Sequence, residues 1–567
     1  MTSAALPIRE VRGQRPGQVV TSSSNLAPST AAVVAGIADW WASRAEAAGL
    51  NRRWLDVGWA VDAEPVEILP GTPVLALTGT AEQVGHTYVS TLPTTERSKY
   101  GRHYTPQSLA DELWRMAKHS MGWKRPQALS GQVMDPACGA GALLLPVLRE
   151  HLGAAARVDA QLALNALPNY ISGVDNDPIA VWIANVLLAS EMLPILARTE
   201  RARRNPLPAL VRYGDGLAEV DERVRVVIMN PPYGRVRLGD QERMRFSDTL
   251  YGHANLYGLF MAAAIEALDR HGVLAALVPT SFLAGRYFEN LRAVLAEDLA
   301  LREIEFVADR SGSFSGVLQE TCLVTFTRSR ARKVNVANIN GRVNPVAQLA
   351  SPRISGPWLL PRRADDAAVA AAAMDMPLTL ASAGWKISTG PLVWNRRKSD
   401  LKAEPGERRV RIIWAADIDG GIIHRDSARD VTRFLELKGS DEQVMVLDRP
   451  AVLIQRTTAP EQSRRLISVY LGKDTLKDWG GRVVVENHVN VAKPIVADPA
   501  LSVRALGKLF ATDTIDRLLR CLSGSVAVSA YELEALRLPE EAVLKEWTLL
   551  SDDDFDQAVA VAYRFKG

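Results

Sequence analysis

The stretch VRVVIMNPPYGRV, residues 224–236, decides how the middle of this 567-residue chain folds. Its β-branched, apolar run is typical of a strand buried on both faces, and Pro231 and Pro232 must end that strand because neither can donate to a ladder. Asn230, Tyr233 and free backbone carbonyls therefore reach one sheet edge. These groups suit a planar amine: Asn230 and the Pro231 carbonyl can accept its hydrogens while Tyr233 stacks on the ring. A Pro-Pro turn after a strand also occurs without a function, so the remainder of the chain has to decide.

Strand-like and helical runs alternate between about residues 100 and 330, which is the pattern of a parallel sheet covered by helices. We expect seven strands in one doubly wound, Rossmann-like α/β sheet with ligands at its carboxyl edge. The expected strands are 132–135, 170–175, 211–214, 224–230, 273–278, 301–307 and 321–327.

Length and composition indicate several domains in an ordinary globular protein, with 47% hydrophobic residues. We expect a flexible tail (1–30), a small N-terminal accessory region (31–97) with a helix at about 31–48, the sheet domain (98–345), and a mixed α/β C-terminal domain (346–567). In the last of these, helices are expected at 365–374 and 502–522, and many short strands between 380 and 500.

Charge and cysteine usage exclude little. The net charge of +3 is weak evidence about partners, because a nucleic-acid binder can confine its basic surface to one face. Cys138, Cys322 and Cys521 form no CxxC pair, which indicates a reducing compartment and gives no support for a metal site. We identify no apolar stretch as long as a membrane span and no signal-peptide core, so we expect a cytoplasmic protein.

Three further motifs follow expected strands. In DPACGAG (135–141) the glycines allow a sharp turn and close approach of backbone to a ligand, and the leading acid suits a cofactor with a cationic, amino-acid-like tail. Asp175 in GVDNDP can bind both hydroxyls of a ribose, or it can cap the next helix, as Asp177 can equally do. Asp215 in YGDG can accept from the amine of an adenine, or form a simple turn. No GxxxxGK[ST] loop is present, which argues against a triphosphate ligand.

The order YTP, DPACGAG, GVDNDP, GDG and NPPY resembles that of the gamma-class, TaqI-like N6-adenine DNA methyltransferases, which use S-adenosylmethionine. The resemblance covers about residues 98–330 and includes RHYTP at 102–106, NLYGLF at 255–260 and SFSG at 313–316. It implies the cofactor residues Thr105, Asp135, Ala137, Cys138, Gly139, Gly141, Asp175, Asn176 and Asp215. It also implies that Asn230, Pro231, Pro232 and Tyr233 hold the target adenine, with Phe314 against its edge.

The sequence departs from this family at three positions. Asp175 stands where glutamate is commoner, Ala140 where serine is commoner, and Gly216 where a bulky apolar residue often covers the adenine of the cofactor. Aspartate keeps the chemistry of glutamate with a shorter reach, whereas Gly216 leaves open what packs on that ring.

The resemblance implies transfer of a methyl group from S-adenosylmethionine to N6 of an adenine flipped out of duplex DNA, as in the modification enzyme of a restriction-modification system. A sulfonium methyl group is already activated, so direct transfer needs positioning more than acid–base catalysis. No cysteine nucleophile is required, and we interpret Cys138 as a small loop residue.

The C-terminal third resembles the target-recognition domains attached to this family, in GWKISTG (384–390) and ENHVN (486–490). Its basic clusters can neutralise phosphates, while arginine and amide side chains can recognise base edges; a solvated basic face is the alternative. The candidate DNA contacts are Arg396, Arg397, Lys398, Gln455 and Arg456.

Two alternative functions stay open. The chain can be the methylating subunit of a multi-subunit restriction complex, with specificity in another polypeptide. It can also be a protein-glutamine methyltransferase, since an NPPY site suits a side-chain amide. We expect a monomer that acts on double-stranded DNA, has a cognate restriction endonuclease in the same system, and has no membrane partner.

Overall fold

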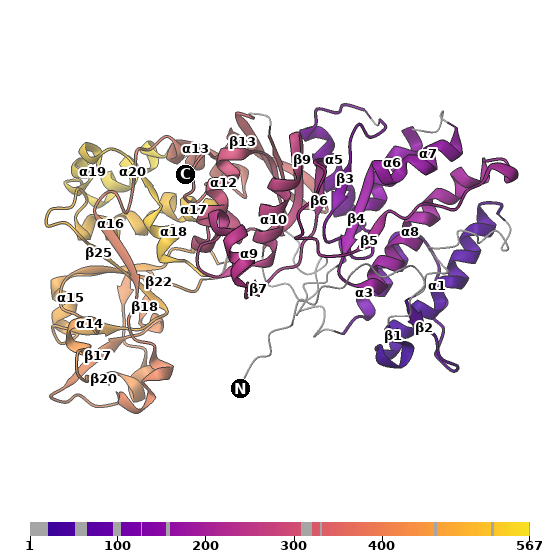
Figure 1. Ribbon diagram of the computed structural model, residues 1–567. Coiled ribbons are helices and arrows are strands. Elements are labelled where there is room, and N and C mark those ends of the chain that lie inside the picture. Colours follow the sequence, from indigo (N-terminus) through magenta and orange to yellow (C-terminus); the bar gives the residue numbers. More distant parts are fainter. Residues whose placement is uncertain are drawn as a thin grey trace.

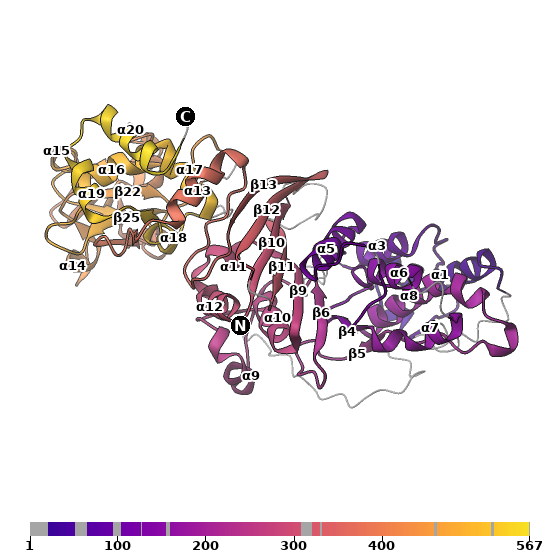
Figure 2. The same ribbon diagram turned by 90° about the horizontal axis from the view of Figure 1, so that it is seen from above.

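The computed structural model describes residues 21–50, 65–93, 104–125, 127–154, 159–307, 320–328, 331–458, 462–522 and 527–565. A twisted central sheet lies in the middle of the molecule, with the N-terminal helices on one side of it and the C-terminal third on the other (Figures 1 and 2). The lower part of that C-terminal third projects beyond the rest of the protein in Figure 1.

The central sheet has nine strands in the described part of the chain, and the expected count of seven is wrong. All seven expected strands are present, but a hairpin of two more extends one edge. In spatial order the strands are β13 (Arg342–Ala350), β12 (Lys333–Asn340), β10 (Ala300–Val307), β11 (Thr321–Thr327), β9 (Leu268–Pro279), β6 (Val224–Met229), β3 (Val133–Asp135), β4 (Ile171–Asp175) and β5 (Val211–Tyr213). The pairs β9–β11, β10–β11 and β12–β13 are antiparallel and the others parallel, so the sheet is mixed. Because β13 ends at Ala350, the sheet crosses the domain boundary expected at residue 345.

The middle strands are buried on both faces, as the apolar run of β6 predicts. Val226 and Ile228 belong to one apolar core, whereas Val227 and Met229 belong to another. Successive strand residues point to opposite faces, so a strand covered by helices on both sides has to be apolar throughout. The helices against the first face are α1 (Pro28–Ala47), α3 (Ala81–Thr91), α5 (Gln107–Ser120), α6 (Leu144–Ala154), α7 (Ala160–Ala166) and α8 (Pro178–Ala197); α10 (Leu256–Ala267), α11 (Ser281–Ala284) and α12 (Glu289–Asp298) cover the second.

Helix α8 corrects the expectation that no apolar stretch reaches the length of a membrane span. Its 20 residues are long and apolar enough for one, but 78% of its most apolar 18-residue window is buried inside the protein. It packs against α1, α3, α6 and α7 and against β4 and β5. The composition of α8 is therefore that of a central core helix.

The N-terminal region is built onto the sheet domain. Helices α1 and α3 pack against α8 and share its core through Trp41, Val84 and Tyr88. Thr21 and Ser22 form strand β1, which pairs with β2 (Val66–Glu67). Residues 21–30 are therefore ordered, against the expected flexible tail, whose residues 1–20 lie outside the described part of the chain.

The C-terminal third contains the short strands and helices that the sequence predicts. One sheet has the order β15 (Trp385–Thr389), β25 (Val489–Pro494), β22 (Ala451–Gln455), β23 (Ser468–Leu471), and a second has the order β16 (Leu401–Lys402), β20 (Phe434–Glu436), β17 (Arg409–Ile413), β24 (Val483–Val485), β21 (Val446–Leu447). The helices are α13 (Ala367–Met374), α14 (Asp441–Met445), α15 (Lys473–Asp478), α16 (Val503–Ala511), α17 (Asp513–Leu522), α18 (Ala530–Glu534), α19 (Glu541–Thr548) and α20 (Asp552–Ala562). Helices α13, α16 and α17 share a core with the sheet domain, whereas β17 and β24 contribute to two small cores of their own.

Three two-stranded ribbons complete the described structure. They are β7 (Arg235–Val236) with β8 (Ala254–Asn255), β14 (Leu378–Thr379) with β26 (Arg537–Leu538), and β18 (Ile418–Asp419) with β19 (Ile422–Ile423). The first of them follows the NPPY motif directly and leads into α9 (Asp240–Arg245).

Candidate active site

A cavity of about 230 Å³ lies at the carboxyl edge of the sheet, where β3, β4, β5 and β6 end. The motifs that sequence analysis places at this edge therefore meet in one hollow, as the fold requires of parallel strands. From those motifs the cavity is lined by Tyr104, Thr105, Asp135, Pro136, Ala137, Cys138, Gly139, Ala140, Asp175, Asn176, Asp177, Asp215, Gly216, Asn230 and Pro232.

The glycine loop after β3 turns sharply back toward β4. Gly139 and Gly141 have φ values of 51° and 83°, in the left-handed region that favours glycine. The Gly139 N–H donates to Oδ2 of Asp175 at 2.9 Å, so the loop is tied to the end of the neighbouring strand. A Cβ atom on Gly139 would have no protein atom within 4 Å, so this face of the loop is open to a ligand.

The sequence leaves open whether Asp175 or Asp177 caps the next helix, and whether Asp175 binds a ribose. Asp177 caps α8 by accepting the N–H of Ile179 at 3.0 Å. Asp175 is half-buried at the cavity wall, where its two oxygens accept the N–H groups of Gly139 and Asp177, each at 2.9 Å. Both residues line the cavity, but Asp177 caps α8, so Asp175 is the better candidate for binding a ligand there.

Asp135 is a buried carboxyl group at the floor of the cavity, with 1% of its surface exposed. One oxygen accepts the N–H of Ala137 at 3.0 Å. Burial raises the pKa of Asp135 from its ordinary value to about 8, against the opposing effect of the Ala137 N–H, and the nearby Asp175 adds to the rise. A cationic group placed beside Asp135 would have the reverse effect and favour the ionised form.

Asp215 and Gly216 form the far wall of the cavity. Asp215 is exposed, and its Oδ1 accepts the N–H of Leu217 at 2.9 Å. A Cβ atom on Gly216 would lie 1.8 Å from the carbonyl oxygen of Pro136, so no larger residue fits here without a shift of the glycine loop. The apolar lining on this side comes instead from Leu217 and Phe260.

Asn230 stands at the end of β6 with both ends of its amide engaged. Its Nδ2 donates to Oγ1 of Thr105 at 3.0 Å, and its Oδ1 accepts the hydroxyl of Tyr233 at 2.9 Å. Thr105 is 4% exposed, so the bond to it is sheltered from water and holds the amide in place. The Tyr233 hydroxyl also lies 3.3 Å from the carbonyl of Leu277, which is a second acceptor within its reach. Burial raises the pKa of Tyr233, so the phenol stays protonated.

Comparison with known proteins finds restriction-modification methyltransferases that are similar to this chain. A family model described as Eco57I restriction-modification methylase matches residues 169–312. The Type II methyltransferase M.PstI of Providencia stuartii is 26% identical over 338 residues, which cover 56% of this chain and 66% of that protein, just under two thirds. The Type II methyltransferase M.BsuBI of Bacillus subtilis is 20% identical over 479 residues, 79% of this chain and 89% of that one. These similarities support a restriction-modification methyltransferase.

The fold of this restriction-modification methyltransferase is also that of a solved relative. The structure of the Type IIL restriction-modification enzyme MmeI in complex with DNA superposes with a TM-score of 0.51 at 14% sequence identity. The superposition covers 88% of this chain and 80% of that one, so the similarity includes the C-terminal third as well as the sheet.

Part of the cavity of this methyltransferase could not be foreseen from its motifs. Tyr88 and Val89 of α3 line it, together with Leu92 at the end of that helix, although the N-terminal region carries no recognisable catalytic pattern. The ring of His86 lies edge-on to Tyr104, with 5.6 Å between ring centres, which joins α3 to the YTP motif. Tertiary packing alone brings this helix to the site.

Other expected site residues of the methyltransferase lie beside the cavity or outside the described structure. Gly141 shapes the loop by its backbone, while Pro231 and Tyr233 flank Asn230 without lining the cavity. Cys138 is buried, and burial raises the pKa of its thiol well above the ordinary range, which fits a loop residue rather than a nucleophile. Phe314 lies outside the described residues.

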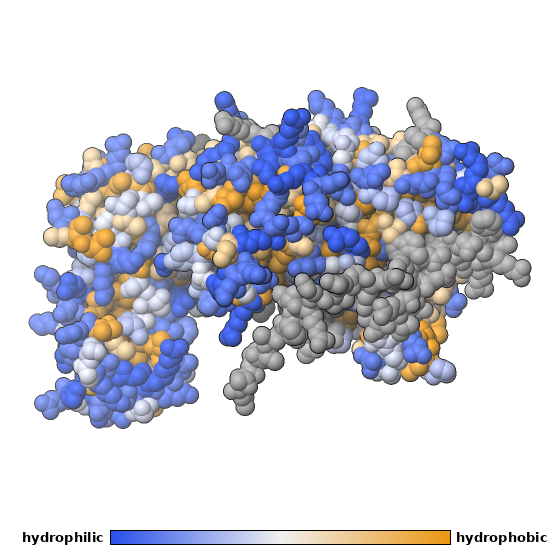
Figure 3. Space-filling view, viewed as in Figure 1, coloured by the Kyte–Doolittle hydropathy of each residue, from blue (hydrophilic) through white to orange (hydrophobic). Residues whose placement is uncertain are grey.

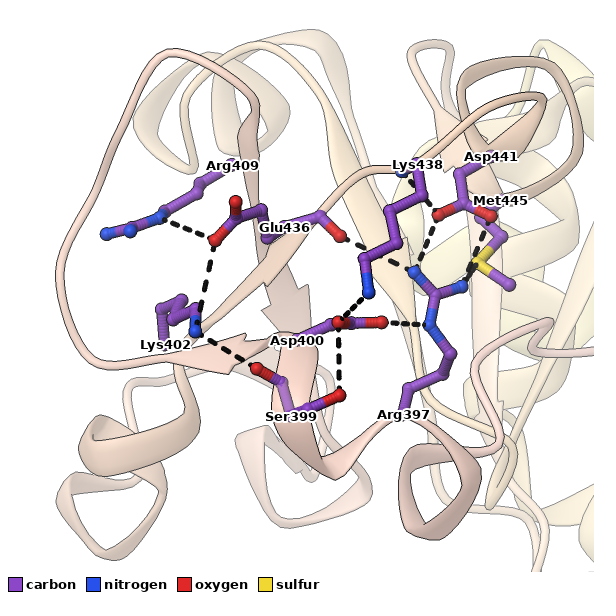
Figure 4. Close-up of polar contacts among 9 residues, drawn as sticks. All are labelled: Arg397, Ser399, Asp400, Lys402, Arg409, Glu436, Lys438, Asp441 and Met445. Atoms are coloured by element: carbon purple, nitrogen blue, oxygen red, sulfur yellow. Dashed lines mark hydrogen bonds and ion pairs between the residues drawn. The ribbon is translucent and has the colours of Figure 1, made fainter.

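Two of the five candidate DNA contacts, Arg397 and Gln455, make hydrogen bonds inside the C-terminal third of the methyltransferase. Arg397 binds Asp400 through Nε at 2.6 Å and Asp441 through Nη2 at 2.7 Å, and Lys438 also contacts Asp400 (Figure 4). Hydrogen bonds from Lys438 and Arg397 lower the pKa of Asp400 to about 2. The guanidinium group of Arg397 therefore joins the turn at Asp400 to the start of α14.

Gln455 is also engaged inside the protein. Its Nε2 donates to the carbonyls of Ala415 at 3.0 Å and Ile418 at 2.7 Å. Arg456 is half-buried, with its Nη1 3.4 Å from the carbonyl of Asn487.

Arg396 and Lys398, by contrast, are exposed. They lie in the C-terminal third of the chain, which we call the C-terminal lobe. The lower surface of this lobe is mostly hydrophilic in Figure 3.

Proposed function

We propose that this chain transfers a methyl group from S-adenosylmethionine to N6 of an adenine flipped out of duplex DNA. The observation that carries the proposal is Asn230, hydrogen-bonded to buried Thr105 and to Tyr233, at the edge of a cavity that is also lined by Asp135, Gly139 and Asp175. An amide acceptor next to a site for a cationic nucleoside is the arrangement that N-methylation of a planar amine requires. Similarity to restriction-modification methyltransferases supports the same conclusion.

The residues of the cavity fit S-adenosylmethionine. Buried Asp135 offers a carboxylate to an ammonium group, and the open face of Gly139 allows close approach of the methionine end. Asp175 suits a pair of ribose hydroxyls, and Asp215 with the adjacent Leu217 and Phe260 suits an adenine ring. The bound cofactor supplies a methyl group already activated on a sulfonium.

The protein prepares the amine of the target base for attack. The lone pair of an adenine amine is delocalised into the ring, and accepting hydrogen bonds from both amine hydrogens localises it on nitrogen in the transition state. Asn230 Oδ1 is one acceptor. The Pro231 carbonyl is the other, and within the described residues no donor bonds to it. When the amine takes Asn230 Oδ1, the Tyr233 hydroxyl can turn its hydrogen to Leu277, so no buried polar group is left unpaired.

The C-terminal third is proposed to recognise the DNA sequence. Arg396 and Lys398 are exposed and suited to phosphates or base edges, whereas Arg397 and Gln455 serve the internal structure of that region. Flipping the base costs a few kcal/mol, which stacking on Tyr233 and contacts in the pocket offset. Protection of DNA from a cognate restriction endonuclease is the corresponding biological role.

The test is methyl transfer by the purified chain alone. Unmethylated duplex DNA is incubated with S-adenosylmethionine labelled in its methyl group, and the DNA is digested to nucleosides and analysed by mass spectrometry. Labelled N6-methyladenine is the expected product. Labelled N4-methylcytosine would overturn the adenine assignment. Cofactor binding without transfer would indicate a missing specificity subunit.

Cofactor affinity is expected to rise with pH because of Asp135. In the free protein burial raises the pKa of this carboxyl to about 8, so the group holds its proton at neutral pH. Binding an ammonium group favours the ionised form and releases that proton, so affinity should increase by up to about tenfold per pH unit between about pH 6 and pH 8 and level off above. Calorimetric titration with S-adenosylmethionine in buffers of different ionisation enthalpy measures both the affinity and the proton release.

Asp135→Asn is the control for this pH dependence. It has no proton to lose, so its affinity should be weaker and independent of pH over the same range. An affinity of the unmodified protein that does not change between about pH 6 and pH 8 would contradict the role given to Asp135.

A further inference from the structure

Exposed arginines and aromatic rings gather around the ribbon that follows Tyr233. We call this group the rim patch: Arg235, Arg237, Tyr251, His253, Arg286 and Tyr287. The guanidinium carbon of Arg235 lies 5.8 Å from the ring centre of Tyr287, and that of Arg286 lies 5.2 Å from the ring centre of Tyr251. The ring of His253 lies 5.8 Å from that of Tyr287. The patch thus combines cations with flat aromatic surfaces that hold them in place.

The cations of the rim patch are available to a ligand. Arg235, Arg237, His253 and Arg286 are all exposed, and so is Tyr287, with 45% of its surface accessible. Among the described residues, the guanidinium groups of Arg235, Arg237 and Arg286 have no ion-pair partner. Nearby Arg245 differs, because it is bound to Glu266 at 2.7 Å. Unpaired arginines held against aromatic rings are suited to anionic groups from outside the protein.

Buried packing ties the rim patch to the candidate active site. The N–H of Leu256 donates to the carbonyl of Gly234 at 2.9 Å, which closes the ribbon next to Tyr233. The ring of Tyr257 stacks on Phe288 at 5.0 Å and meets Tyr233 edge-on at 6.1 Å. Because Phe288 directly follows Tyr287, the patch has a fixed position relative to the place where a flipped base would stack.

We propose that the rim patch grips the sugar–phosphate backbone of the DNA strand that carries the target adenine, on either side of the flipped nucleotide. This inference rests on the proposed function. The arginines would bind phosphates, and the exposed Tyr287 ring would pack on the sugar or base next to the gap. In Figure 1, β7 and α9 lie at the lower side of the central body, the side on which the C-terminal lobe also projects. A duplex bound along this side could contact both surfaces.

The test compares two double variants that remove the same charge. Arg235→Ala/Arg286→Ala removes two cations of the patch. Arg332→Ala/Arg353→Ala removes two exposed arginines beside β12 and β13, at the opposite, amino edge of the sheet. Fluorescence anisotropy with duplex DNA over a salt series gives the affinity and its salt dependence. Thermal melting and titration with S-adenosylmethionine show that each variant keeps its fold and its cofactor cavity.

The patch variant is expected to bind duplex DNA more weakly, with the slope of log affinity against log salt reduced by about two, or about one per arginine. The control variant should keep the slope of the unmodified protein. Equal slopes for the patch variant and the unmodified protein would overturn the proposal. Equal losses in both double variants, or no binding of DNA by the unmodified chain, would overturn it as well.

The inference and the proposed function can fail separately. If the chain methylates adenine but the patch variant keeps its DNA affinity, the function stands and the patch does not. If no base is methylated but the patch variant alone loses salt-dependent binding, DNA binding by the rim patch is supported and the proposed methylation is rejected.

Discussion

Replacing Asn230 with alanine is expected to abolish detectable methylation while leaving cofactor binding intact. The amide stands at the end of β6, at the edge of the cavity, and the bond to buried Thr105 holds it there. Losing one preorganised group that stabilises the transition state costs about 10²- to 10³-fold in kcat, and more where the group also positions the base. Single-turnover methylation at saturating S-adenosylmethionine measures this loss, and calorimetry measures the cofactor affinity.

The matched control for Asn230→Ala is Asn335→Ala. It makes the same truncation on β12, in a side chain that bonds to Gln348 at the far side of the sheet. The control should methylate at the rate of the unmodified protein. A methylation rate of Asn230→Ala within about tenfold of the unmodified rate would assign the amine to another acceptor, since so small a loss is below that of one oriented group.

The sequence predicted the sheet edge well because each motif there is local. A strand, a turn-forming glycine or proline and a polar side chain lie within a few residues of each other, and parallel strands bring such turns together at one edge. The hairpin β12–β13 was missed although Asn340 and Gly341 carry a turn signal, with φ of 67° at Gly341. Its strands contain Asn335, Asn338 and Pro345, so neither resembles the apolar strands before it.

Roles that depend on partners distant in sequence could not be predicted. Arg397 looks like a DNA contact in a basic cluster, but its partner Asp441 lies 44 residues away and arrives with α14. Tyr88 lies on α3, which no motif marks, and only packing against α8 brings it to the cavity. Composition places arginines on a surface, whereas the tertiary fold decides which of them are paired.

Replacing Asp175 with alanine is expected to weaken binding of S-adenosylmethionine by about 100-fold or more. A hydrogen bond to a charged group contributes about 1.5–3 kcal/mol, and the proposed pair of ribose hydroxyls would lose two such bonds. The glycine loop would also lose the hydrogen bond that joins it to β4, because the N–H of Gly139 donates to Oδ2 of Asp175 at 2.9 Å. Equilibrium titration gives the dissociation constant, and the methylation rate at saturating cofactor should recover most of its value.

Asp159→Ala separates the loss of a ribose ligand from the loss of a carboxylate that supports the backbone. Like Asp175, Asp159 accepts two backbone N–H groups, those of Gln161 and Leu162 at 3.0 and 3.1 Å, but it caps α7 away from the cavity. Its removal should lower folding stability slightly, through loss of the helix cap, and leave cofactor affinity unchanged. If Asp175→Ala instead lowers stability as Asp159→Ala does and binds the cofactor normally, then Asp175 only fastens the loop. The ribose would then need another partner in the cavity.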